Sequence, residues 1–185
     1  LVTTRCAIIT RPAAPSRRGE TSSIQPVLER FYSCIEKITS PGTLDGGDVM
    51  QVGEHFYIGI SARTNLAGAN QLISILERYG MSGATVPVTE CLHLKTGVTC
   101  VSENTLLAAE AYVSRPEFAA FNVLPVTDGE NGAANCIHIN GKVLMPTGFP
   151  QVRQQLITEG AQVIEIDISE FAKLDGGLTC LSLRF

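Results

Sequence analysis

One succession of structural signals recurs along this chain: strand, tight turn, strand, helix, strand. In the clearest copy, apolar residues over 49–52 and an alternating run over 55–60 flank a Gly-Glu turn, a pattern typical of a β-hairpin. Asn65 then stands where a helix would begin, and apolar residues follow at helical spacing over 66–76. A short apolar strand over 84–88 completes the copy. The pattern predicts an α/β fold assembled from ββαβ units.

The same succession occurs in unequal copies on both sides of the first. The later copies have strand signals over 98–101, 105–108 and 123–126 with a helix from Pro116, and over 136–139, 143–145 and 163–166 with a helix from Pro150. The opening third resembles a partial copy, with a strand over 5–10, a helix over 22–34 and a strand over 35–38. Because no long linker separates the copies, we predict a single domain over residues 1–185.

The last apolar strand, over 178–183, has no copy of its own. In a closed ring of units it would complete the first copy and leave no sheet edge open. Because hairpins separate the helices, we predict a closed ring of these units, with an open α/β sheet as the alternative. The chain begins at Leu1 in a strand-like run and without an initiator Met. We therefore expect an N-terminal segment to be missing and the ring to be incomplete at that end.

The composition excludes several classes of protein. Hydrophobic residues make up 44% of the chain and charged residues 17%, which is a globular balance and not that of a disordered chain. The apolar runs are too short to span a membrane, and a net charge of −4 without a basic face argues against nucleic acid. The six Cys show no CxxC and no regular spacing, which argues against a disulfide framework or a zinc site. We therefore expect a reducing, cytoplasmic location.

The tetrapeptide Leu-Asp-Gly-Gly occurs twice, at residues 44–47 and 174–177, each time before a predicted strand. Asp and Gly suit a tight turn for backbone reasons alone, so a turn is the simpler explanation of the pair. The functional interpretation is that paired Gly let the backbone pass close to a ligand, while Asp supplies an anion.

Four single residues could take part in catalysis or binding, although each also has a simpler structural explanation. His93 lies in the segment 91–95, which we expect to be extended; alone it is most simply a satisfied His. Arg63 precedes a helix start and Arg17 lies in a Pro- and Ser-containing loop; both are either solvated or forks for a carboxylate. Cys180 follows the second Gly-Gly. A Cys beside such a loop, with a His elsewhere, fits a nucleophile as well as a buried strand residue.

Taken in order, these motifs resemble the dimethylarginine dimethylaminohydrolase family of the guanidine-modifying superfamily, which includes arginine deiminase. The resemblance covers essentially all 185 residues, and several matches in the right order are more specific than any one. The matching segments are Ile9-Thr10-Arg11-Pro12, Ala14-Pro15-Ser16-Arg17-Arg18, Leu44-Asp45-Gly46-Gly47-Asp48, Ser61-Ala62-Arg63-Thr64-Asn65, Leu92-His93-Leu94-Lys95, Ala134-Asn135-Cys136-Ile137 and Leu178-Thr179-Cys180.

The resemblance implies a fold and a role for each site residue. The fold would be a five-fold α/β propeller (pentein) of ββαβ units, in agreement with the repeats. Cys180 would be the nucleophile and His93 the general acid and base. Asp45 would hold the guanidinium, and Arg17 and Arg63 would bind the substrate α-carboxylate. The family also carries an acidic segment upstream, absent from this sequence, so we expect the 185-residue chain alone to be inactive.

The implied reaction is hydrolysis of an Nω-methylated arginine to citrulline and dimethylamine. A thiolate is a better nucleophile than water, and its pKa falls near a cation, here the substrate itself. Cys180 would attack the guanidinium carbon, and His93 would protonate the leaving amine. Water activated by His93 would then hydrolyse the S-alkylthiouronium on Cys180. The implied reaction needs no metal and no organic cofactor. The expected partner is the small-molecule substrate. A homodimer is the assembly to test.

Two other functions stay open at the level of the sequence. An arginine deiminase or another amidine hydrolase would use the same machinery with a different leaving group, and would differ in the room around the distal nitrogens. A non-catalytic guanidine-binding relative would have lost Cys180 or His93, and both are present.

Overall fold

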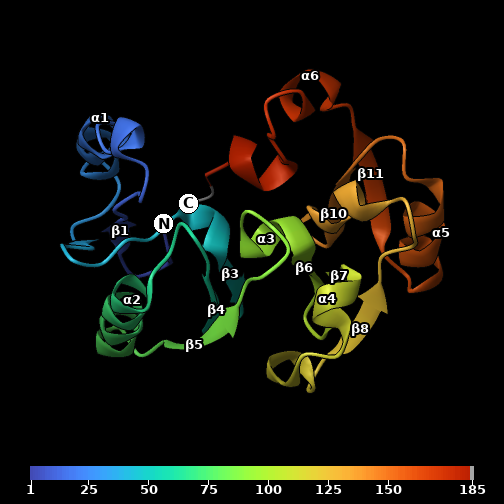
Figure 1. Ribbon diagram of the computed structural model, residues 1–185, viewed down its shortest axis with the longest axis horizontal. Coiled ribbons are helices and arrows are strands. Elements are labelled where there is room, and N and C mark those ends of the chain that lie inside the picture. The colour runs from blue at the N-terminus through green and yellow to red at the C-terminus, as the bar shows by residue number, and fades with distance from the viewer. Residues whose placement is uncertain (184–185) are drawn as a thin grey trace. The chain divides into compact units, whose positions relative to one another are not determined.

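The computed structural model describes residues 1–183, which divide into two compact units (Figure 1). Unit 1 comprises Leu1–Leu94 and unit 2 comprises Lys95–Ser182. Both contain small sheets with helices beside them, so the α/β class is confirmed. The single domain over residues 1–185 stays a prediction.

Unit 1 contains a two-stranded and a three-stranded sheet. Its elements are β1 (Ala7–Ile9), α1 (Glu20–Leu28), β2 (Ile35–Lys37), β3 (Val49–Val52), β4 (His55–Ile60), α2 (Leu66–Arg78) and β5 (Ser82–Pro87). β3 and β4 form an antiparallel hairpin, and β5 returns parallel to β4 after α2. α2 packs along β4 and β5 (Figure 1). This arrangement confirms the ββαβ unit predicted from the sequence.

The ends of α2 follow from local sequence signals. The Asn65 side chain accepts a hydrogen bond from the Gly68 N–H at 2.8 Å, as expected of an N-cap. A Cβ at Gly68 would lie 2.1 Å from the Thr43 carbonyl oxygen, so only glycine lets the start of α2 approach the loop at Thr43 so closely. Gly80 follows the helix with a φ of +70°, a conformation that glycine adopts without strain.

The strand β1 buries both of its faces, because successive side chains point to opposite sides of a strand. Ile8 packs into the main core of unit 1 with side chains of β4 and α2, whereas Ala7 and Ile9 pack against Leu28 of α1. The helix predicted over 22–34 is shorter, since α1 ends at Leu28. The Arg30 and Phe31 N–H groups then bond to carbonyls three residues back, in a turn that precedes β2.

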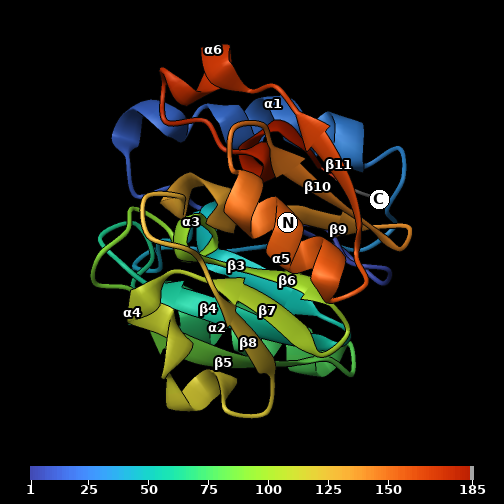
Figure 2. The ribbon, with the colours of Figure 1, turned by 90° about the vertical axis from the view of Figure 1, so that its right-hand side faces the viewer.

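Unit 2 repeats the hairpin–helix–strand arrangement twice. Its elements are β6 (Val98–Ser102), β7 (Thr105–Ala108), α4 (Glu110–Val113), β8 (Asn122–Pro125), β9 (Ile137–Ile139), β10 (Lys142–Pro146), α5 (Pro150–Thr158), β11 (Gln162–Ile166) and α6 (Ser169–Ala172). β6 pairs antiparallel with β7 and β9 with β10, while β8 and β11 lie parallel to their neighbours. The helix α5 packs on β11 (Figure 2). The repeat prediction is therefore confirmed for these two copies.

Two local predictions in unit 2 differ in outcome. The Asn140-Gly141 turn has φ values of 51° and 70°, as a two-residue hairpin turn requires. The helix expected from Pro116 is only a 3₁₀ turn, Pro116–Phe118, and α4 precedes it without having been predicted.

The predicted strand over 178–183 is wrong. Leu178–Leu181 forms a 3₁₀ helix instead. The Cys180 N–H bonds to the Gly177 carbonyl at 3.0 Å, and the Thr179 N–H bonds to the Asn135 side chain at 2.9 Å. Neither amide is free for a strand ladder, so this segment does not add an edge strand.

Candidate functional site

The first Asp-Gly-Gly motif brings three predicted site residues together in unit 1. Asp45 is buried with 3% of its surface exposed, directly before the 3₁₀ helix Gly46–Asp48. Its Oδ2 atom lies 3.2 Å from Nε2 of His93 and 3.6 Å from a guanidinium nitrogen of Arg17. This copy of the motif therefore places a carboxylate in contact with an imidazole and a guanidinium, and its role in binding a ligand stays a prediction.

Opposing effects act on the pKa of the Asp45 carboxyl. Burial raises this pKa, because it disfavours the charged form. The hydrogen bond with His93, the Ala13 N–H at 3.4 Å and the charges of His93 and Arg17 lower it and outweigh burial. The net result is a pKa below the ordinary Asp value, so Asp45 is an anion at neutral pH.

This pKa shift predicts a specific dependence of stability on pH. A carboxyl whose folded pKa lies below its unfolded value stabilises the fold above the unfolded pKa, and loses that contribution as pH falls through the folded pKa. We expect the stability difference between wild type and Asp45→Asn to shrink as the pH falls below about 4. Urea unfolding across the acid range measures it. Asp175→Asn, in the exposed second copy of the motif, is the matched control. If the free energy of unfolding fell with pH identically in wild type and Asp45→Asn, the lowered pKa assigned to Asp45 would be contradicted.

His93 lies where the backbone turns and not in an extended segment. Residues 91–93 form bends, and the short helix α3 (Leu94–Gly97) starts directly after them. The extended segment expected over 91–95 is therefore wrong. A Cβ at Gly47 would lie 2.6 Å from Cγ of His93, so the second glycine of the motif makes room for the imidazole ring. The His93 side chain is 17% exposed, which leaves it accessible to a small molecule.

A fully buried carboxylate, Asp48, was not assigned a role from the sequence. Its Oδ2 atom accepts hydrogen bonds from the Ser61 and Thr64 hydroxyls, both at 2.7 Å. Its Oδ1 atom accepts one from the Leu94 N–H at 2.9 Å. The sequence signals were its place at the end of the matching segment 44–48 and directly before the apolar strand β3. Its partners could not be predicted, because they lie far away in the chain.

The two predicted arginines occupy different positions in unit 1. The Arg17 side chain is 49% exposed and donates two hydrogen bonds of 3.0 Å to Glu20, beside its contact with Asp45. Arg63 lies in the turn between β4 and α2, and its N–H donates to the Ser61 hydroxyl at 2.9 Å. The structure therefore brings Arg17 to Asp45 and His93, and places Arg63 beside Thr64 in the turn that Asp48 holds.

Cys180 lies in unit 2, in the 3₁₀ helix after the second Gly-Gly, and its thiol is free and exposed. Asn135 fixes this segment: its amide oxygen accepts from the Thr179 N–H at 2.9 Å, and its amide nitrogen donates to the Thr179 hydroxyl at 3.1 Å. A Cβ at Gly177 would lie 2.7 Å from Asn135. Asp175 is exposed with a φ of 57°, so the Asp of this copy is a turn residue.

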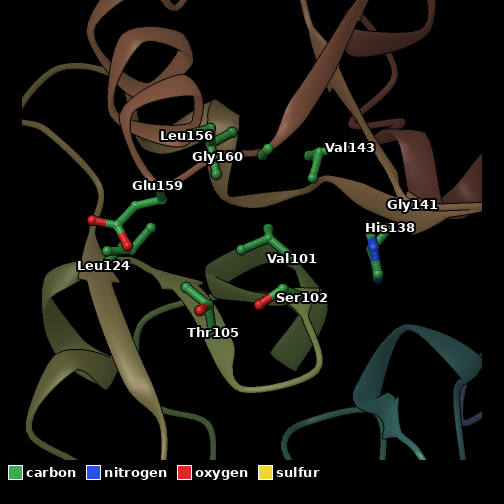
Figure 3. A pocket seen from close by; sticks show the side chains of 11 residues that line it. Val101, Ser102, Thr105, Leu124, His138, Gly141, Val143, Leu156, Glu159 and Gly160 are labelled. Atoms are coloured by element: carbon green, nitrogen blue, oxygen red, sulfur yellow. The ribbon is translucent and has the colours of Figure 1, made fainter.

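Two hollows, one in each unit, lie apart from the predicted site residues. A cavity of about 140 Å³ in unit 2 is lined by side chains of β6, β7, β10 and the end of α5, with Ser102, Thr105 and Glu159 among its polar groups (Figure 3). A hollow of about 300 Å³ in unit 1 lies beside Arg11 and Arg18. Neither is lined by a residue predicted to take part in catalysis or substrate binding.

Two classes of feature are absent from residues 1–183. These residues contain no group of three or more His, Cys, Asp or Glu arranged to hold a metal ion. No helix among them is both long and apolar enough to cross a membrane.

Comparison with known proteins identifies the family. The arginine deiminase family profile matches residues 3–142, so the chain belongs to the arginine deiminase family. The dimethylarginine dimethylaminohydrolase of Pseudomonas aeruginosa is 53% identical over 100% of this chain and 73% of its own length. The enzyme of the same name from Streptomyces coelicolor is 38% identical over 96% of this chain and 68% of its own. Within the family, the chain groups with the dimethylarginine dimethylaminohydrolases, as its motifs predicted.

Solved structures show the same relationship. A cysteine-to-serine variant of the P. aeruginosa enzyme, in complex with citrulline, superposes with a TM-score of 0.97 over 100% of this chain and 73% of its own. The N-terminal domain of a cyanobacterial arginine dihydrolase superposes with a TM-score of 0.89 over 100% of this chain and 72% of its own, at 20% identity, a likeness of fold alone. The predicted α/β pentein fold is therefore confirmed.

Proposed function

We propose that Cys180 and His93 carry out the hydrolysis of dimethylarginine by this protein. The protein is a hydrolase of the C–N bonds of linear amidines, as its family and its 53% identity to a dimethylarginine dimethylaminohydrolase indicate. The substrate is a small cationic guanidine, and the products are citrulline and dimethylamine.

The observation that carries the proposal is the buried Asp45 carboxylate in contact with Nε2 of His93. A guanidinium presents planar N–H groups, and a carboxylate accepts such groups with charge-assisted hydrogen bonds. A nitrogen bound by Asp45 therefore lies close to the imidazole that touches the same carboxylate. The dimethylated nitrogen has no N–H group, so Asp45 holds a neighbouring nitrogen of the same guanidinium, and His93 gives its proton to the dimethylated nitrogen as the C–N bond breaks.

The reaction then proceeds in two balanced steps. The Cys180 thiolate forms a bond to the central guanidinium carbon, the bond to the dimethylated nitrogen breaks, and His93 supplies the proton that dimethylamine carries away. In the second step, neutral His93 accepts a proton from water, whose oxygen bonds to the same carbon. The C–S bond breaks and Cys180 leaves as thiolate. The protonated urea that remains loses its second proton to solvent, and the amino acid leaves as citrulline.

Three of the other cysteines are poorly suited to act as the nucleophile. Burial raises the pKa of the Cys6 and Cys100 thiols, and raises that of Cys136 to about 12. A thiol with a raised pKa supplies little thiolate, which is the reactive form. Cys180 is exposed at the end of a glycine-rich loop, where a substrate has access to it.

The proposal is tested by measuring citrulline and dimethylamine released from dimethylarginine by the full-length protein. Monomethylarginine and arginine are compared at equal concentration. Preference for arginine with release of ammonia would favour the alternative, an arginine deiminase. No turnover of any amidine would favour a guanidine-binding relative without catalysis.

For recognition of the α-carboxylate, we propose Arg63 together with Arg17. Arg63→Lys is expected to raise KM for dimethylarginine about tenfold, because a lysine cannot replace the two parallel hydrogen bonds of a guanidinium fork. Agmatine-like guanidines, which lack the carboxylate, are expected to show no such change. Arg78→Lys is the matched control, since Arg78 pairs with Glu36 at 2.8 Å. Equal losses on both substrates would make Arg63 a structural residue.

A cytoplasmic location and a homodimeric assembly, both expected from the sequence, stay predictions. Fractionation of cells and light scattering on the purified full-length protein measure them directly.

A further inference from the structure

We propose that Asp48 is a positioning residue for the reaction. It holds His93 and Asp45 at the spacing that keeps their side chains in contact. The inference rests on the proposed function of His93 and Asp45. It adds a residue that lies behind them and is itself fully buried.

Asp48 connects the three segments of chain that carry Asp45, Arg63 and His93. Its Oδ1 atom accepts the N–H of Leu94, the residue directly after His93. Its Oδ2 atom accepts the Thr64 hydroxyl, and the oxygen of that hydroxyl accepts the Asp45 N–H at 3.1 Å. The same Oδ2 atom accepts the Ser61 hydroxyl in the turn that contains Arg63. One carboxylate therefore determines the spacing of three segments.

The direction of each hydrogen bond is fixed by the other bonds of its partner. The Ser61 oxygen accepts the N–H groups of Arg63 and Thr64, at 2.9 and 3.1 Å. A hydroxyl has one proton and two lone pairs, so its proton is left for Asp48. The Thr64 oxygen accepts the Asp45 N–H, so its proton also goes to Asp48. The Leu94 N–H can only donate. Asp48 must therefore accept at both of its oxygens.

An asparagine at this position satisfies only part of the arrangement. With its oxygen toward the two hydroxyls, its NH₂ group faces the Leu94 N–H, donor against donor. With its oxygen toward Leu94, its NH₂ group faces two hydroxyl protons. The first orientation keeps two of the three bonds and releases the segment that carries His93. We therefore expect Asp48→Asn to fold and to misplace the imidazole.

The first experiment measures kcat and KM for dimethylarginine in full-length Asp48→Asn. We expect kcat to fall about 10²-fold, the effect of a misplacement of about 1 Å, with a smaller change in KM. Glu130→Gln is the matched control, because Glu130 is also a buried carboxylate and accepts the N–H groups of Gln151 and Val152 at the start of α5. We expect it to lower the melting temperature and to leave kcat within about twofold.

A second pair of variants tests the same linkage without changing a charge. Thr64→Val removes the hydroxyl that joins Asp48 to the Asp45 N–H, whereas Thr64→Ser keeps it. We expect Val to lower kcat at least about tenfold and Ser to retain most of it. This pair carries the test if Asp48→Asn does not fold. Equal kcat in the two Thr64 variants would overturn the inference.

A spectroscopic measurement separates this inference from the proposed function. The Nε2 resonance of ¹⁵N-labelled His93 reports its contact with Asp45, and Asp45→Asn gives the shift that follows when the contact is lost. We expect Asp48→Asn to move the resonance in the same direction, and Glu130→Gln to leave it in place. A shift in a protein that does not hydrolyse dimethylarginine would contradict the proposed function and retain the linkage. An unmoved resonance in Asp48→Asn, or a kcat within about twofold of wild type as expected of Glu130→Gln, would overturn the inference.

Discussion

Cys180→Ser is expected to abolish citrulline release from dimethylarginine, with a loss of at least about 10³-fold in the full-length protein. A serine hydroxyl is not ionised near neutral pH, so it does not supply the anionic nucleophile that a thiol supplies. Substrate binding is expected to persist, because Asp45, Arg17 and Arg63 are unchanged. Citrulline assays measure the first effect and calorimetric titration with dimethylarginine measures the second.

The matched control for this variant is Cys34→Ser, since Cys34 is the other exposed cysteine. It is expected to retain full activity. Turnover that persists in Cys180→Ser and disappears in Cys34→Ser would identify Cys34, and not Cys180, as the nucleophile.

His93→Ala is expected to lower kcat by about two to four orders of magnitude, the usual contribution of a positioned acid–base group. The second step needs a base to activate water, so the thiouronium adduct on Cys180 is expected to accumulate. Intact-protein mass spectrometry after rapid acid quenching detects it, and peptide mapping locates it. The wild-type protein under the same conditions shows the level that normal turnover leaves.

His55→Ala is the control, because His55 lies on β4 with its Nδ1 atom 2.8 Å from the Ser82 hydroxyl. It is expected to keep the activity of wild type. An unchanged rate in His93→Ala would remove His93 from the mechanism, and an adduct on a cysteine other than Cys180 would reassign the nucleophile.

The repeats were predictable because their signals are local. Alternating apolar residues, the Asn140-Gly141 turn and the Asn65 cap each act over a few residues, and the structure has the expected element at each. The end of α1 and the nature of the segment 178–181 were not predictable in this way. In the second case an apolar, β-prone sequence is held in a 3₁₀ turn by a side chain 44 residues away, that of Asn135.

The candidate site shows the same division. Cys180, His93, Asp45, Arg17 and Arg63 were selected by residue type and by the order of motifs, and the structure brings three of them together in unit 1. Asp48 was missed because its partners lie 13, 16 and 46 residues away, and no short window of sequence contains them. The bend at His93 was also missed, since alternation over five residues does not reveal that the Leu94 N–H is bound by a distant carboxylate.

The two glycines of the first Asp-Gly-Gly motif are unequal in how freely they can change during evolution. A methyl group at Gly46 would meet no atom within 4 Å, whereas one at Gly47 would overlap the ring of His93. We therefore expect a side chain to fit at the first position and to displace the imidazole at the second. In a distant relative, loss of the second glycine is thus a sign that His93 has moved or has been replaced, and loss of the first carries no such information.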